Sequence, residues 1–301
     1  MKGVEAFLGM SEARSANIRA AVPLLEKGFL NPISDEWRLE AGVLLVDAYQ
    51  RLDDRAKMQQ TLAALERAYP ANTEVLYLAY RVYAAHAARA VTALVKAAPD
   101  SARLHQIAGE MIEGDGDYPA AVTQYRKALE KEPRLPGGHR ALGVALMNKS
   151  TDEASRREAE HHFRAELELN PNDAAAEYQL GEMMWLGNQP KEALGHFNRA
   201  LELQENFPDA LIAAGKAYSA LKQPAQAVRL LEKAVALDPQ HDVARYRLAQ
   251  ALKALGNQDR AEREFIEFRR LRSAQESLRT LYRQIQENRI TSQTLDEPGS
   301  R

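Results

Sequence analysis

Two stretches of the sequence, 102–135 and 208–241, follow the same pattern over 34 residues each. In both, two segments with apolar residues at helical spacing flank a short polar turn. Pro133 and Pro239 are expected to end the second helix of each stretch, because proline lacks an amide hydrogen and clashes with the preceding turn. A helix pair that recurs at a fixed period predicts a stacked array rather than one globular core.

Aligning the whole chain on this pattern gives about eight repeats, which start near residues 2, 39, 73, 102, 136, 174, 208 and 242. Place 20 of each repeat is almost always alanine: Ala21, Met58, Ala87, Ala121, Ala159, Ala193, Ala227 and Ala261. Place 8 is small in six repeats, with Gly9, Gly109, Gly143, Gly181, Gly215 and Ala249. Place 24 is large and apolar, with Leu25, Leu62, Val91, Tyr125, Phe163, Phe197, Leu231 and Phe265. We expect the small residues to let the two helices of a repeat cross closely, with place 24 filling the remaining space.

This set of columns resembles the tetratricopeptide repeat (TPR), and in particular bacterial arrays of it, without pointing to one member. The resemblance covers nearly the whole chain. It implies an all-α fold, a right-handed superhelical solenoid of antiparallel helix pairs with a capping helix at its carboxyl end.

The pattern predicts four regions. Residues 1–101 hold degenerate repeats, in which 73–98 forms either one long helix or two, because it contains no turn-forming residue. Residues 102–275 hold regular repeats, 276–290 form the capping helix, and 291–301 are expected to be a disordered tail.

The resemblance also implies a concave groove lined by the first helix of each repeat, which would bind a peptide or a partner helix. The residues that fall at groove places are Tyr77, Arg81, Arg103, Gln106, Glu110, Arg140, Tyr178, Glu182, Trp185, Lys216, Tyr246, Gln250 and Lys253. Tyr178, Trp185 and Tyr246 are the expected anchors, since amphipathic aromatic side chains dominate interface energetics. The alternative for Trp185 is that it packs between helices.

Some members of the family clamp the terminal carboxylate of a chaperone tail with lysine, asparagine and arginine. Gln106, Glu110 and Gln179 stand at clamp places here, so this activity is not expected. Arg247 alone matches a clamp place, and a single arginine there is read as a surface ion pair.

Composition narrows the function further. Lysine and arginine number 40 against 42 aspartates and glutamates, which disfavours a nucleic-acid binder, and no apolar run is long enough to insert into a membrane. There is no cysteine, phosphate-binding loop or nucleophile motif, so we expect no enzyme activity, no cofactor and no metal.

The sequence therefore predicts a non-catalytic scaffold or adaptor with a protein or peptide partner. Three alternatives stay open: a component of a bacterial secretion, pilus or outer-membrane assembly machine, the repeat part of a larger enzyme, or an array that self-associates through Leu271, Leu278 and Leu281. A complete chain would be cytoplasmic, whereas one that has lost an export signal would be periplasmic or attached to the envelope.

Two local features fall outside the pattern. His161 and His162 lie at places 22 and 23, which are expected to be solvated, and a metal role would need further converging ligands. Glu166 occupies place 27, where comparable repeats have Ala128, Ala200 and Ala234. A carboxylate there should face the next repeat, so it must find a partner or stay protonated.

Overall fold

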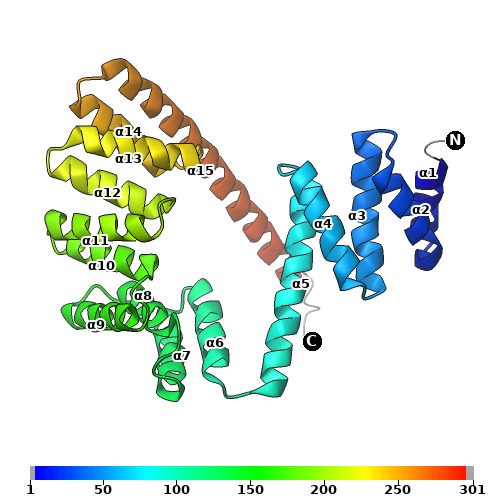
Figure 1. The fold of residues 1–301 in the computed structure, drawn as a ribbon, viewed down its shortest axis with the longest axis horizontal. Helices are drawn as coiled ribbons and strands as arrows, with labels where there is room; N and C mark the ends of the chain where they lie inside the picture. Colours follow the sequence, from blue (N-terminus) through cyan, green and yellow to red (C-terminus); the bar gives the residue numbers. More distant parts are fainter. Residues whose placement is uncertain (1–3, 296–301) are drawn as a thin grey trace. The chain divides into compact units, whose positions relative to one another are not determined.

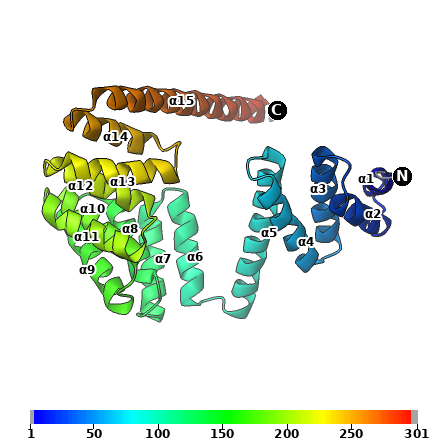
Figure 2. The ribbon, with the colours of Figure 1, turned by 45° about the horizontal axis from the view of Figure 1, so that its top comes forward.

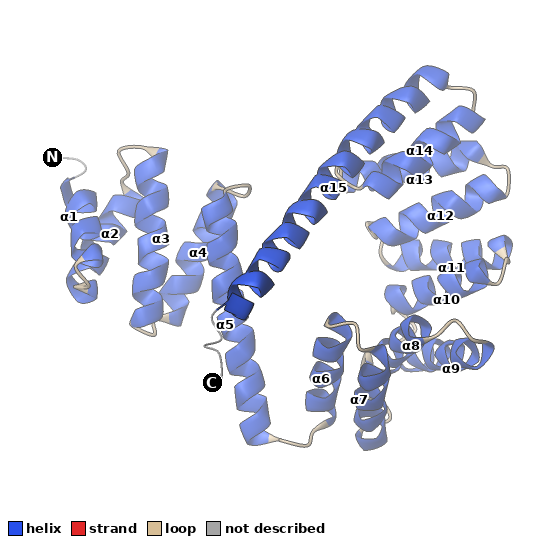
Figure 3. Cartoon of the chain, turned by 180° about the vertical axis from the view of Figure 1, so that it is seen from behind, coloured by secondary structure: helices blue, strands red, loops and turns tan. Residues whose placement is uncertain are grey.

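The computed structural model describes residues 4–295, and every regular element in that range is an α-helix (Figures 1 and 3). The chain divides into two compact units, Met1–Pro99 and Asp100–Arg301, which we call the N-terminal and C-terminal units. Each unit is built of antiparallel helix pairs in which neighbours along the chain pack on each other.

The N-terminal unit consists of two helix pairs and one long helix. Its elements are α1 (Val4–Arg14), α2 (Ile18–Leu30), α3 (Asp35–Arg51), α4 (Arg55–Ala68) and α5 (Thr73–Ala97). Leu25, Leu45, Leu62 and Leu65 are fully buried at the centre of its core. The amino-terminal half of α5 completes that core with Val75, Leu78, Ala79 and Val82.

The sequence predicted either one helix or two over residues 73–98. In the structure this segment forms the single 25-residue helix α5. It begins at Asn72, whose side chain accepts hydrogen bonds from the amides of Glu74 and Val75 at 3.0 and 3.2 Å. No glycine, proline or asparagine interrupts it. It ends just before Pro99, because the residue that precedes a proline disfavours helical backbone.

The C-terminal unit stacks five helix pairs (Figure 2). The first helices of the pairs are α6 (Ala102–Gly114), α8 (Gly138–Lys149), α10 (Ala174–Leu186), α12 (Pro208–Ala220) and α14 (Asp242–Ala254). The second helices are α7 (Tyr118–Lys131), α9 (Glu153–Leu169), α11 (Pro190–Leu203), α13 (Pro224–Leu237) and α15 (Gln258–Leu295).

The predicted contact between places 8 and 24 is confirmed in four of these pairs. A methyl group added at Gly109, Gly143 or Gly181 would lie 2.5 Å from the ring of Tyr125, Phe163 or Phe197, respectively. At Gly215 it would lie 2.6 Å from Leu231. The glycines therefore allow the close approach of the two helices, and the large side chain of the second helix fills the crossing.

The last helix, α15, runs without a break from the last repeat through 276–290, the residues predicted as the capping helix. It also extends through 291–295, where a tail was predicted, and the rest of that tail, 296–301, lies outside the described residues.

Leu271 is buried, which corrects the expectation that it belongs to an exposed self-association surface, whereas Leu278 is half exposed. The side chain of Leu281 lies outside the described residues. None of the described helices combines the length and apolarity needed to cross a membrane.

Candidate functional site

A depression of about 210 Å³ opens between α10, α12 and α14, the first helices of three successive pairs. Three of the predicted groove residues, Tyr178, Glu182 and Lys216, line it together. The other lining residues are Asp209, Ile212, Ala213, His241, Val243 and Arg247. The helix-pair pattern places the first helices side by side, so residues about 34 positions apart in the sequence converge here.

Burial shifts the pKa values of several ionisable groups that line this depression. It raises the pKa of the Glu182 carboxyl, against the opposing effect of the Lys216 ammonium. It lowers the pKa of Lys216, while Glu182 acts in the opposite direction. Burial also raises the pKa of the Tyr178 hydroxyl, helped by the negative charges of Glu182 and Asp209. The site thus holds charges of both signs that are partly withdrawn from water.

Trp185 does not line the depression but supports it. Its half-buried ring packs against the cluster around Phe197, and the ammonium of Lys216 lies 4.1 Å from the ring centroid. A cation over an indole face is an attractive arrangement. The packing alternative considered from the sequence therefore describes Trp185 better than an open groove anchor does.

The two predicted tyrosine anchors each lean on aromatic side chains. Tyr178 lies 5.9 Å from Phe197 and 5.3 Å from Phe207 between ring centroids. Tyr246 lies 5.9 Å from Phe265 and 5.1 Å from Phe268. Both rings are half-buried, so only part of each is available to a ligand.

Arg247, read from the sequence as a surface ion pair, instead contacts its own helix. Its guanidinium donates to the side-chain oxygen of Gln250 at 3.2 Å and lies 5.8 Å from the centroid of Tyr246. Gln250 in turn donates to the Tyr246 hydroxyl at 3.0 Å. Arg247 lines the depression but was not among the predicted groove residues, although its clamp-like place was a signal.

The remaining predicted groove residues lie elsewhere. Arg103 donates to Gln106 at 2.7 Å and to the Pro136 carbonyl at 3.1 Å, and Arg140 pairs with Asp173 at 3.2 Å. Glu110 on α6 and Lys253 on α14 are exposed. Tyr77 and Arg81 belong to α5 of the N-terminal unit, where both are exposed and the guanidinium lies 6.0 Å from the ring centroid.

Models of the tetratricopeptide repeat match residues 115–150, 152–210 and 218–285, each described as a TPR or tetratricopeptide repeat. The chain is a tetratricopeptide repeat protein. Its repeats make it a scaffold for interactions with other proteins.

Solved structures of TPR proteins share the fold. MamA 41-end from Desulfovibrio magneticus RS-1 is 23% identical, with a TM-score of 0.50 over 58% of this chain and 97% of that one. The MamA RS-1 ArsTM double mutant is 23% identical, with a TM-score of 0.51 over 59% and 98%. Pseudomonas aeruginosa pilF is 20% identical, with a TM-score of 0.51 over 56% and 75%. No curated protein sequence matches the chain.

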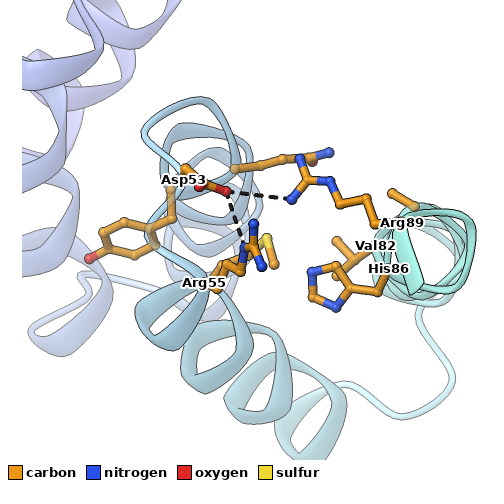
Figure 4. Close-up of a pocket in the computed structure, with 9 residues that line it drawn as sticks. Asp53, Arg55, Val82, His86 and Arg89 are labelled. Carbon is orange, nitrogen blue, oxygen red and sulfur yellow. Dashed lines mark hydrogen bonds and ion pairs between the residues drawn. The ribbon is translucent and has the colours of Figure 1, made fainter. Parts of the chain in front are cut away.

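The TPR protein has a second, smaller pocket within its N-terminal unit, between the α3–α4 turn and α5 (Figure 4). Asp53 in that turn accepts hydrogen bonds from Arg55 at 3.2 Å and Arg89 at 3.4 Å. Val82 and His86 face the same space from α5 (Figure 4). The contacts fasten α5 to the preceding pair, which is a structural role.

The histidine pair of this TPR protein differs from the expectation. His161 is exposed, but the side chain of His162 is only 15% exposed, so the prediction that both are solvated is wrong for His162. His162 stacks on His139 of α8, with ring centroids 5.1 Å apart and the two Nδ1 atoms 2.9 Å apart. The place of His162 in the repeat does not reveal that the neighbouring helix α8 carries a histidine against it.

The neutral tautomers of this pair follow from one further contact. Nε2 of His139 lies 3.0 Å from the Pro133 carbonyl, which can only accept, so His139 carries its proton there. Its Nδ1 then accepts from Nδ1 of His162. Burial is the main cause that lowers the pKa of His162 to about 4, and positive charge on His139 and His161, when those rings are protonated, acts in the same direction. Among the described side chains, no three histidine, aspartate or glutamate groups converge to hold a metal ion.

Proposed function

We propose that the depression between α10, α12 and α14 is the partner-binding site of this scaffold, and that it takes an extended peptide segment. The observation that supports this most directly is that the charged groups of Glu182 and Lys216 are partly buried. Their pKa values respond to burial and to the field of nearby charges, with no hydrogen bond to either group in the described structure. Groups that are partly desolvated and lack a bonded partner gain most from a ligand that supplies one.

The lining defines the chemistry of the peptide. Ile212 and Ala213 on α12 contribute apolar surface to the lining. Lys216 and Arg247 offer two cations, while Glu182 and Asp209 offer two carboxylates. We expect a segment with one apolar side chain flanked by charged or amide groups. A phosphate-rich nucleic acid would need a stripe of one sign, which this site lacks.

Trp185 and Tyr178 have a supporting role in this proposal. Trp185 positions Lys216 over its ring, and Tyr178 forms the wall next to Glu182. Removing Trp185 should therefore weaken binding through the placement of Lys216 rather than through a lost direct contact.

The site can be tested with a displayed peptide library and charge reversal. The wild-type chain should enrich a peptide class, and Lys216→Glu or Arg247→Glu should weaken its binding at least about tenfold, equivalent to about 1.4 kcal/mol. Arg229→Glu, at an exposed position of the second helix α13, is the matched control and should bind as the wild type does. Equal enrichment by all four proteins would place the binding surface elsewhere.

A photocrosslinking residue at position 243 gives an independent measurement. Val243 is 41% exposed and lines the depression. Benzoylphenylalanine at this position should crosslink to an enriched peptide, and the same residue at position 229 should not. Crosslinking at 229 alone would contradict the proposal.

A further inference from the structure

The long helix α5 shows an apolar seam that the N-terminal unit leaves uncovered. Its inner face packs on α4 through Val75, Leu78 and Val82. On the opposite side lie Tyr77, Tyr80, Ala84, Ala87, Val91 and Leu94, which we call the α5 seam. Tyr77 and Tyr80 are 59% and 69% exposed.

The spacing of the seam is that of a coiled coil. Its residues follow one another at alternating intervals of three and four, which keeps them on one stripe of a helix that pairs with another helix. None of the six carries a charge. An exposed apolar seam of this kind indicates a helical partner.

The repeat alignment shows which partner is complementary. In the regular pairs, place 8 of the first helix contacts place 24 of the second, as Gly181 contacts Phe197. In this repeat those places are Tyr80 and Val91, and both lie on the same helix, α5. They therefore cannot meet within one copy unless the helix breaks.

We propose that the α5 seam binds the α5 seam of a second copy of this chain, in an antiparallel pair related by a two-fold axis. The amino-terminal half of each α5 then packs on the carboxyl-terminal half of the other, as the two helices of a regular repeat do. This is an exchange of equivalent elements between two copies, a low-cost route to a dimer.

The side chains fit this register. Tyr77 lies opposite Leu94, Tyr80 opposite Val91, and Ala84 opposite Ala87. The large rings thus meet smaller aliphatic groups, and the alanines at the axis allow the helices to approach closely.

The oligomeric state of the full chain tests the proposal. Sedimentation velocity over a wide concentration range should show a reversible dimer. Ala87→Glu should raise its dissociation constant at least about tenfold, because it places two carboxylates near the axis. Ala63→Glu, at an exposed alanine of α4 in the same unit, is the control and should leave the dimer unchanged. A monomer at every concentration, or a dimer that Ala87→Glu does not weaken, would overturn the proposal.

Cysteine crosslinking tests the antiparallel register, and the chain has no cysteine of its own. In the proposed pair, two copies of residue 77 lie about 25 Å apart along the axis, at 1.5 Å per residue. A short bismaleimide should therefore not link Tyr77→Cys chains to each other, nor Leu94→Cys chains to each other. Co-expressed Tyr77→Cys and Leu94→Cys chains should be linked. Efficient self-linking of Tyr77→Cys would indicate a parallel pair and contradict the proposed register.

Discussion

The Glu166 carboxylate on α9 accepts a hydrogen bond at 2.9 Å from the amide of Gly137, the N-cap residue just before α8. Its second oxygen accepts from the amide of Arg140 at 3.2 Å. Gly137 has no side chain to cap its helix, whereas Asp117, Asp152 and Asp173 cap theirs. Glu166 therefore supplies the cap from a neighbouring helix, and its negative charge is favourable at a helix amino terminus.

We predict that Glu166→Ala lowers the free energy of unfolding by about 2–3 kcal/mol, because the half-buried amides of Gly137 and Arg140 lose their charged acceptor. Glu166→Gln keeps one acceptor oxygen and should cost less. The exposed Glu168 lies on the same helix, so Glu168→Ala is the control and should change stability by less than about 0.5 kcal/mol. Urea denaturation measures all three. An equal effect at 166 and 168 would mean that the cap contributes little.

The His139–His162 contact predicts an acid-sensitive step in stability. The unfolded chain takes up a proton at His162 as the pH falls below about 6.5, but the folded chain does so only near pH 4. The unfolded state therefore binds more protons between these values, and the stability falls with pH through this window, by up to about 3 kcal/mol. Denaturation midpoints from pH 7 to 4 measure the loss.

His162→Gln removes the titrating ring and retains a donor for His139. We expect the difference in stability between this variant and the wild type to change with pH only between about 6.5 and 4. The exposed neighbour His161 contributes to the same shift, so His161→Gln should narrow the pH window but leave a step in stability. A pH dependence of His162→Gln identical to that of the wild type would show that His162 is not the cause.

The glycine columns predict opposite effects at two positions of one helix pair. Gly181→Ala would place a methyl group 2.5 Å from the Phe197 ring, so the crossing must open, and we expect a loss of about 1–3 kcal/mol. Gly195 on α11 has nothing within 4 Å, and Gly195→Ala should stabilise the helix by about 0.5–1 kcal/mol. Thermal unfolding distinguishes the two. A stabilising Gly181→Ala would contradict the close crossing.

The repeat columns were sufficient to predict the helix pairs and the places where they cross, because these depend on contacts repeated at a fixed spacing. The burial of Glu166 was predictable for the same reason, since alanine occupies its place elsewhere. The hydrogen-bond partner of Glu166 was not predictable, because the acceptor for the Gly137 amide belongs to the start of one helix, α8, and is not part of the repeated pattern.

Departures from the pattern were the hardest features to predict. The side chain of His162 stands at a place that is usually solvated, but here the ring of His139 on α8 stacks on it. Trp185 was expected as a groove anchor, but Lys216, a full repeat away, lies over its ring. Arg247 lines the depression because its helix neighbours α12. In each case one particular side chain on another helix decides the environment.

The turn inside each helix pair gives the last prediction. At equivalent turns the backbone has positive φ, at Gly116 (84°) and Gly256 (87°) but also at Lys222 (62°). Left-handed backbone costs about 1–2 kcal/mol for a residue with a Cβ atom and little for glycine. Lys222→Gly should therefore stabilise the C-terminal unit. The gain should not exceed about 1 kcal/mol, because glycine also raises the conformational entropy of the unfolded chain, which opposes the effect. Gly256→Ala, with nothing within 4 Å of the added methyl group, should destabilise it through the backbone alone. Chemical denaturation that gives the same sign for both substitutions would contradict the requirement for left-handed backbone at these turns.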